Sequence, residues 1–253
     1  MLNRDEIIEY LKDFAINKDY VYAMWLEGAD GVNRVDEYSD IDFWFDVEKT
    51  HQESFLNECI DRLKILGNID SQVNDIRKEI AQSNIHLDNT NEYLTLDICV
   101  QSHQIRGKEA TMFINNDIAE RPKVIFDKKN IITYKDEVLD KEQLKEIFNH
   151  NKYRIKQQSR VTKYIKRNEY LEAYMKYITN IADPLVKIAR LIYTPRHTDY
   201  VLCHINTHLP KDVVEELEKL YKVTNFNDIE NNLDYANRLL EKYEETLKND
   251  LLI

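Results

Sequence analysis

The chain has 253 residues and carries 46 Asp and Glu against 35 Lys and Arg, which gives a formal net charge of −11. This length is enough for one large or two small domains with a full hydrophobic core. The acidic balance argues against a general nucleic-acid binder, which needs a basic face to neutralise phosphates, but it is compatible with a cationic small molecule.

Neither disulfides nor membrane spans are indicated. The cysteines lie far apart, without the Cys-x-x-Cys pair of a zinc ribbon: Cys59, Cys99 and Cys203. No run approaches the ~18 apolar residues of a membrane span, and the N-terminus lacks the pattern of a signal peptide. We therefore expect a cytoplasmic protein with no membrane partner.

The first predicted element is an amphipathic helix over residues 3–14, in which Asn3 and Glu6 can form a capping box. Its apolar side chains share one face: Ile7, Ile8, Leu11 and Phe14. Residues 20–26, which are aromatic-rich and largely apolar, predict a buried strand.

A glycine turn is predicted directly after this strand. Gly28 and Gly31, two of the four glycines in the chain, can adopt positive φ and let the backbone approach a ligand. The next strand alternates between an apolar face (Ile41, Phe43, Phe45 and Val47) and a polar face (Asp40, Asp42, Trp44 and Asp46). Because side chains of a strand repeat every two residues, Asp40 and Asp42 are expected to point the same way.

A third aspartate, Asp97, follows a second amphipathic helix predicted over residues 55–66. It lies in an alternating strand over 93–101, which we expect to form a hairpin with residues 85–87. If the two Asp-bearing strands are neighbours, three carboxylates share one sheet face, where their repulsion favours a bound cation. Oxygen ligands of this kind suit Mg²⁺. The alternative to a metal site is that these aspartates are solvated residues at strand ends. Three other acidic residues could complete the set of metal ligands in place of Asp97: Asp70, Asp75 and Asp88.

These motifs resemble the signature of the nucleotidyltransferase superfamily that includes DNA polymerase β and the small antibiotic nucleotidyltransferases. The signature is an apolar residue and Gly-Ser, then, about a dozen residues later, Asp-apolar-Asp, with a third acidic residue on a later strand. Leu26 and Gly28-Ala29 match the first part, Ser39-Asp40-Ile41-Asp42 the second, and Asp97 the third. The resemblance covers roughly the first half of the chain.

The resemblance implies an α+β fold: an N-terminal mixed sheet with helices on one face, followed by a C-terminal helical domain that holds the acceptor. Asp40 and Asp42 would bridge metal ions that hold the triphosphate of ATP, and Asp97 would ligate the catalytic metal and take the proton of the acceptor hydroxyl. Nucleotide contacts are expected from four residues: Gly28, Ala29, Arg34 and Ser39. The chemistry would be in-line attack on the α-phosphorus with loss of pyrophosphate.

The chain departs from this signature in its glycine loop. Ala29 replaces the usual serine, so only a backbone amide remains for the phosphates. Arg34 is the loop's only cation, beside four acidic residues: Glu27, Asp30, Asp36 and Glu37. Acidic side chains beside a triphosphate weaken its binding unless they point away or face a cation.

The remaining elements predict two domains, 1–138 and 139–253. A short strand is expected over 123–126, and apolar periodicity gives way to charge near 136–140. Helical spacing then covers residues 144–165, 170–181, 184–193, 212–221 and 232–247. Asp183-Pro184 is expected to cap and restart a helix. His204 and His208, in the loop over 194–210, could share a helix face, although a structural or substrate-facing loop is favoured over a zinc site.

Three functions are compatible with these features. The first is Mg-dependent transfer of AMP from ATP to a hydroxyl of a small molecule, with an aminoglycoside-like antibiotic as the candidate acceptor. The second is the same chemistry on a protein or a tRNA end, as in the toxin–antitoxin nucleotidyltransferases. Acidic charge counts against tRNA but not against protein. The third, motivated by Ala29 and the acidic loop, is a binding module of the same fold without turnover.

Overall fold

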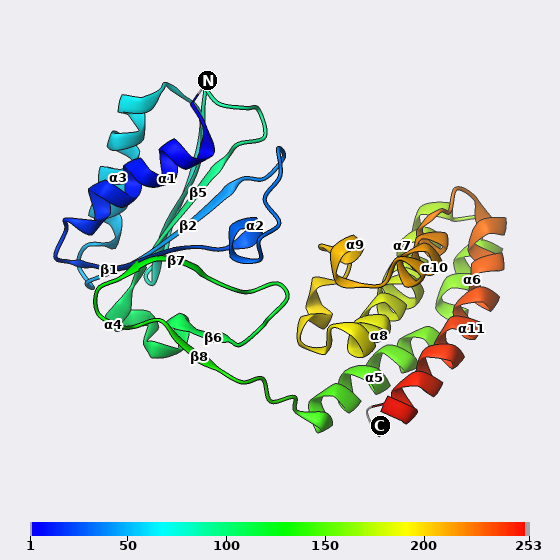
Figure 1. The fold of residues 1–253 in the computed structure, drawn as a ribbon. Coiled ribbons are helices and arrows are strands. Elements are labelled where there is room, and N and C mark those ends of the chain that lie inside the picture. Colours follow the sequence, from blue (N-terminus) through cyan, green and yellow to red (C-terminus); the bar gives the residue numbers. More distant parts are fainter. Residues whose placement is uncertain (1, 251–253) are drawn as a thin grey trace. The chain divides into compact units, whose positions relative to one another are not determined.

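The computed structural model describes residues 2–250, apart from the side chains of residues 249 and 250. The chain divides into two compact units, Met1–Glu137 and Val138–Ile253 (Figure 1). Each unit has its own hydrophobic core. This division lies one residue from the boundary expected from the sequence.

The N-terminal unit is built on a six-stranded mixed sheet with the order β3-β4-β5-β2-β1-β7. Its strands are β1 (Val21–Leu26), β2 (Ile41–Val47), β3 (Ile69–Ile76), β4 (Ile80–Leu87), β5 (Leu96–Ser102) and β7 (Lys123–Asp127). Strands β2 and β5 pair in parallel, and the other neighbours pair antiparallel. A separate two-stranded parallel ladder joins β6 (Met112–Ile114) to β8 (Thr133–Lys135).

Two helices, α1 (Arg4–Ile16) and α3 (Gln52–Leu66), cover one face of this sheet (Figure 1). The predicted capping box begins α1: Asn3 donates its backbone N–H to Glu6 Oε2 at 2.9 Å, and Glu6 returns its N–H to Asn3 Oδ1 at 3.0 Å. The apolar sides of both helices pack on alternate residues of the central strands, such as Phe43 and Ile98. The α+β fold class is therefore confirmed.

The opposite face of the sheet, here called the carboxylate face, carries the polar alternate residues of β2 and β5. Short helical segments follow the central strands: α2 (Gly28–Gly31) after β1, and α4 (His103–Arg106) with a 3₁₀ turn (Lys108–Thr111) after β5.

Strand β3 was not expected from the sequence. Its side chains from Asp70 to Ile76 are exposed, and most are polar, so no apolar alternation indicates a strand. Backbone pairing to β4 from Ile69↔Leu87 to Ile76↔Ala81 holds it in place. It forms one edge of the sheet, where side-chain burial is not required.

The C-terminal unit is helical. It contains α5 (Lys141–Lys156), α6 (Ser159–Lys166), α7 (Tyr170–Tyr177), α8 (Asp183–Tyr193), α9 (Ile205–His208), α10 (Lys211–Tyr221) and α11 (Phe226–Asp250). A π-helical turn (Ile178–Ala182) joins α7 to α8, and a 3₁₀ segment (Pro195–Tyr200) follows α8. Across residues 2–250, no helix combines the length and the apolar character needed to cross a membrane.

The helix expected over 232–247 is longer in the structure (Phe226–Asp250), and two further helix boundaries also differ from the expected ones. The helix expected over 144–165 is broken between α5 and α6, where Gln158 donates to the carbonyl of Leu233 and to Asn237 Oδ1. The side chain of Asp183 does not cap the start of α8, because the chain is already helical before this residue. Its carboxylate instead accepts a hydrogen bond from Tyr221 Oη at 2.8 Å. Both differences come from tertiary contacts, which local sequence patterns do not contain.

Candidate functional site

Asp42 and Asp97 lie side by side on the carboxylate face. Asp42 on β2 is the direct register partner of Asp97 on β5, so the parallel pairing brings the two carboxylates to neighbouring strands. Asp40 lies just before β2 and is exposed. Of the three aspartates that the strand alternation selected, the structure brings Asp42 and Asp97 together, and Asp40 lies just before the start of β2.

Gly28 lies against this pair. It has φ +53°, a left-handed conformation that favours glycine, and a Cβ built on it would lie 1.9 Å from Asp42 Oδ2. The close approach of backbone to carboxylate is thus possible only without a side chain at position 28. Gly31 does not have the positive φ that was expected for it. The segment is one turn of helix, and a Cβ at Gly31 would lie 1.8 Å from the carbonyl oxygen of Arg121.

Burial and mutual repulsion raise the pKa values of these carboxyl groups. Burial raises the pKa of Asp42 to about 7, and the negative charges of Asp40 and Asp97 add to the increase. Burial also raises the pKa of Asp97, against hydrogen bonds from Gln82 Nε2 to both carboxylate oxygens at 2.8 and 2.9 Å. A group of carboxylates that resists ionisation in this way is stabilised by a cation.

Glu27 is a fourth carboxylate of the cluster. It accepts a hydrogen bond from Trp25 Nε1 at 2.8 Å, its pKa is raised by burial, and its charge raises the pKa of Asp42. From the sequence, Glu27 was expected only to disfavour triphosphate binding through its negative charge in the glycine loop. Its position at the end of β1, next to Gly28, was the signal that could have placed it in the site.

Arg4 is a site residue that the sequence analysis missed. Its Nη1 donates to the backbone carbonyls of Ser39 (3.1 Å) and Asp40 (2.7 Å), and its Nη2 pairs with the carboxylate of Asp30. Asp30 is buried and also pairs with Lys123 Nζ at 3.1 Å. A single guanidinium thus ties α1 to the glycine loop and to the start of β2, and two cations compensate the charge of Asp30.

We expect Arg4→Ala to lower the free energy of unfolding of the N-terminal unit by about 2–4 kcal/mol. The change leaves the buried Asp30 with one cation and removes the donor of two carbonyls. Denaturant titration followed by tryptophan fluorescence measures the effect. Lys12→Ala, which removes only an exposed pair with Glu9, is the control and should change the value by no more than about 0.5 kcal/mol. Equal effects of the two changes would contradict the role assigned to Arg4.

The remaining predicted nucleotide contacts are placed in the loop before β2. Ser39 Oγ donates to Asp36 Oδ1 at 2.9 Å and accepts from the backbone N–H of Asp36 at 3.0 Å, so this hydroxyl is used to close the turn. Arg34 has an exposed side chain, and its backbone N–H donates to the carbonyl of Ala29. Their contacts to a nucleotide stay predictions.

Farther along the carboxylate face, β1 and β2 carry an aromatic pair, and β2 and β5 then carry a second polar row. Trp44 stacks on Trp25, with ring centroids 5.9 Å apart, and Arg106 lies over the Trp44 ring. Arg106 Nη1 donates to Gln101 Oε1 at 2.8 Å, and Gln101 Nε2 donates to the fully buried Asp46 at 2.6 Å. This row fixes the end of the sheet away from Asp42 and Asp97.

The donor chemistry of the cluster fits Mg²⁺, because its groups are carboxylate oxygens whose repulsion a cation would relieve. Within the part of the chain that the structure describes, no three or more His, Cys, Asp and Glu side chains are arranged to hold a metal ion. Metal ligation by Asp40, Asp42 and Asp97 therefore stays a prediction. The same finding covers His204 and His208, whose ring centroids are 5.5 Å apart.

No family model and no curated protein matches the chain. Solved structures similar to it include an aminoglycoside 6-adenyltransferase from Bacillus subtilis, with 19% identity and a TM-score of 0.42 over 100% of this chain and 92% of that one. A spectinomycin adenyltransferase from Enterococcus faecialis, solved with ATP and spectinomycin, has 11% identity and a TM-score of 0.36 over 94% and 100%. A nucleotidyltransferase-like protein from Exiguobacterium sibiricum has 11% identity and a TM-score of 0.35 over 96% and 76%. At these values, the function of the chain has to be inferred from its own residues.

Proposed function

We propose that the protein is a nucleotidyltransferase that moves AMP from ATP to a hydroxyl of a small molecule in the cytoplasm. The observation that carries this proposal is the pairing of Asp42 with Asp97 on neighbouring parallel strands, directly beside Gly28. Two carboxylates next to a glycine turn provide ligands for a cation and place backbone close to it.

The residues of the site have separable roles in this proposal. Asp40, Asp42 and Asp97 would hold Mg²⁺, which would supply charge neutralisation for the triphosphate and the leaving pyrophosphate. The carboxylate of Asp97, oriented by Gln82, would accept the proton of the acceptor hydroxyl. Arg4 would keep the loop of Ala29 and Ser39 fixed relative to Asp40, so that the nucleotide meets a rigid backbone.

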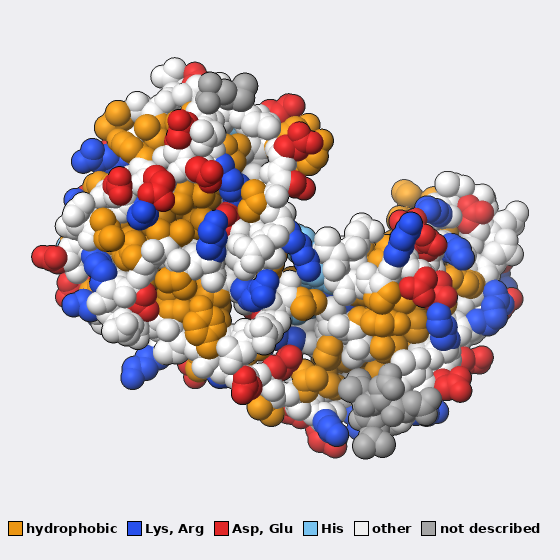
Figure 2. Space-filling model, viewed as in Figure 1, with side chains coloured by type: hydrophobic (Ala, Val, Ile, Leu, Met, Phe, Trp, Pro, Cys, Tyr) orange, Lys and Arg blue, Asp and Glu red, His pale blue; other side chains and the backbone are white. Residues whose placement is uncertain are grey.

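The acceptor in this proposal is a cationic small molecule of the aminoglycoside type. Asp30 does not oppose nucleotide binding, because Arg4 and Lys123 compensate its charge. On the face drawn in Figure 2, Lys and Arg side chains lie among Asp and Glu side chains instead of forming one continuous band. Together with the net charge of −11, this surface supports a small molecule or a protein as the acceptor over a tRNA end.

Calorimetric titration of Mg-ATP tests the nucleotide site. We expect magnesium-dependent binding to the wild-type protein, and its loss in the double variant Asp40→Asn/Asp42→Asn, because two candidate ligands are removed. Titration of ATP with EDTA in place of magnesium is the metal control. Binding that survives in the double variant would contradict the ligand assignment. Where binding is confirmed, mass spectrometry of aminoglycosides incubated with protein and Mg-ATP would detect the addition of one AMP.

A binding module without turnover is the second candidate. It is favoured by Ala29, which lacks the hydroxyl that the resemblance leads us to expect, and by the absence of a three-ligand arrangement among the described side chains. Magnesium-dependent nucleotide binding without product on any acceptor, protein included, would support this candidate over the enzyme.

A further inference from the structure

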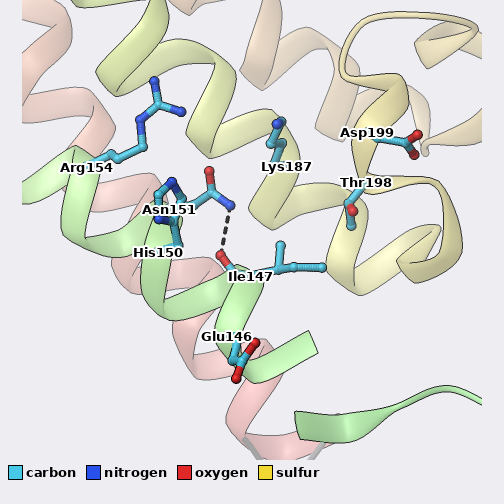
Figure 3. Close-up of a pocket in the computed structure, with 8 residues that line it drawn as sticks. All are labelled: Glu146, Ile147, His150, Asn151, Arg154, Lys187, Thr198 and Asp199. Atoms are coloured by element: carbon cyan, nitrogen blue, oxygen red, sulfur yellow. Dashed lines mark hydrogen bonds between the residues drawn. The ribbon is translucent and has the colours of Figure 1, made fainter. Parts of the chain in front are cut away.

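The helical unit contains a pocket of about 330 Å³ between α5, α8 and the 3₁₀ segment after α8. Figure 3 shows Ile147 and Asn151 of α5 facing Lys187 of α8 and Thr198 of the 3₁₀ segment. Arg154 and Glu146 lie at opposite ends of the same face of α5. The volume is at the lower end of the range for small-molecule sites, so it fits a compact ligand.

Asn151 lines this pocket and carries an unsatisfied hydrogen-bond acceptor. The residue is 3% exposed, and its Nδ2 donates to the carbonyl of Ile147 at 2.8 Å. Its Oδ1 is buried and has no hydrogen-bond partner in the protein. A buried amide oxygen of this kind costs free energy unless a donor reaches it, so the pocket favours a ligand that carries a hydroxyl or N–H group.

Lys187 and Arg154 supply positive charge on one side of Asn151. Lys187 is partly buried on α8, a helix most of whose side chains are buried. It forms no hydrogen bond or ion pair with the described residues. Arg154 uses Nη2 to donate to the carbonyl of Thr179 and keeps other N–H groups for further partners. In Figure 3 both side chains extend beyond Asn151 on the side away from Glu146.

Asp199 does not neutralise this positive end. Its carboxylate is exposed and points away from Lys187 in Figure 3. A partly buried ammonium without a carboxylate partner is stabilised by an anionic ligand.

We propose that this pocket binds a small hydroxylated anion. Its carboxylate or phosphate group is held by Lys187 and Arg154, and its hydroxyl donates to Asn151 Oδ1. Ile147 provides the apolar wall. The site lies wholly within the helical unit and is separate from the Asp42–Asp97 cluster, so it does not depend on nucleotidyl transfer.

Isothermal titration of the full-length protein with four probes tests this proposal. Glycerol 3-phosphate and malate each carry an anionic group and a hydroxyl, succinate lacks the hydroxyl, and glycerol lacks the charge. We expect one-to-one binding of glycerol 3-phosphate or malate. The ligand that binds more tightly shows whether the pocket prefers a phosphate or a carboxylate group. Succinate should bind at least about tenfold more weakly than malate, because it loses the hydrogen bond to Asn151 Oδ1. Glycerol should bind at least about tenfold more weakly than glycerol 3-phosphate, because it loses the charged contacts with Lys187 and Arg154.

Variants assign the binding to this pocket. Lys187→Met and Lys187→Gln should each weaken it about tenfold or more, and Asn151→Leu should remove the preference for malate over succinate. Lys145→Met, which removes an exposed lysine of α5 outside the pocket, is the matched control and should leave affinity unchanged. Circular dichroism checks that each variant is folded.

The proposal is overturned if neither hydroxylated anion binds. It is also overturned if both folded Lys187 variants bind as the wild type does. Binding that is lost in Asp40→Asn/Asp42→Asn and retained in Lys187→Gln would place the anion at the carboxylate cluster and would equally overturn it.

Discussion

Asp42→Asn is expected to stabilise the metal-free protein while it removes the proposed nucleotidyl transfer. The pKa of Asp42 is raised to about 7 by burial and by neighbouring carboxylates, so the ionised side chain opposes folding. An amide at this position keeps the shape of the side chain and removes the charge. We expect the free energy of unfolding to rise by roughly 1–3 kcal/mol at about pH 8. The proposed transfer should fall by about three orders of magnitude, because the change removes a proposed metal ligand.

The sign of this effect depends on pH. In the unfolded chain Asp42 ionises near pH ~4, whereas in the fold it keeps its proton up to about pH 7. The folded state therefore binds more protons between these values, and stability is lost as pH rises through them. The difference between variant and wild type should be small near pH ~4 and complete above pH ~7. Thermal melts in EDTA across this range measure it.

The neighbouring Glu37→Gln is the matched control for Asp42→Asn. Glu37 is an exposed acid of the loop that precedes β2, so its change should alter neither stability nor transfer appreciably. Added magnesium should stabilise the wild type more than Asp42→Asn, since the cation favours the ionised carboxylate. An Asp42→Asn protein that transfers AMP at the wild-type rate would show that Asp42 is not a metal ligand.

Gly31→Ala is expected to be the most destabilising single-methyl change in the glycine loop. The new Cβ would lie 1.8 Å from the carbonyl oxygen of Arg121 and 3.0 Å from its carbon, and both are backbone atoms that cannot rotate away. Relief requires α2 to move from the segment before β7. We expect a loss of about 2–4 kcal/mol in the free energy of unfolding of the N-terminal unit.

Both tryptophans of the chain, Trp25 and Trp44, lie in the N-terminal unit, so their fluorescence in a denaturant titration reports on this unit alone. Gly107→Ala is the control that distinguishes the effect of steric overlap from the effect of backbone strain. Gly107 has φ +74°, but a Cβ there would meet no atom within 4 Å. It should cost only about 1 kcal/mol. A Gly31→Ala protein no less stable than Gly107→Ala would contradict the close packing of α2 against Arg121.

The part of the fold built from periodic segments was predictable. Alternation in β2 and β5 and the capping box of α1 gave the central strands and the first helix, because each segment buries one face against the core. Strand β3 was missed, since an exposed edge strand needs no apolar pattern. Helix α5 was expected to continue into α6, because the contacts of Gln158 with α11 are absent from the local sequence.

The candidate site was predictable in its aspartates but not in its supporting residues. Strand alternation placed Asp42 and Asp97 on one face, and the register then made them direct neighbours. Arg4 lies 26 residues before Asp30 in the sequence, and Lys123 lies 93 residues after it, so their ion pairs could not be inferred from spacing. The sequence therefore indicates which groups carry the charge, whereas the fold determines which groups compensate it.

The parallel pairing of β2 and β5 also bears on the order in which the protein assembles. Residues joined across this pair, such as Asp46 and Gln101, are 55 positions apart. Contacts of this separation require closure of a long loop before they gain any stabilising energy, so they form slowly compared with the local contacts of a helix. A chain in which the sheet is only partly formed has both aspartates but no site. A nascent or partly unfolded chain therefore lacks the proposed nucleotide site, and nucleotide bound at that site would report a completed sheet.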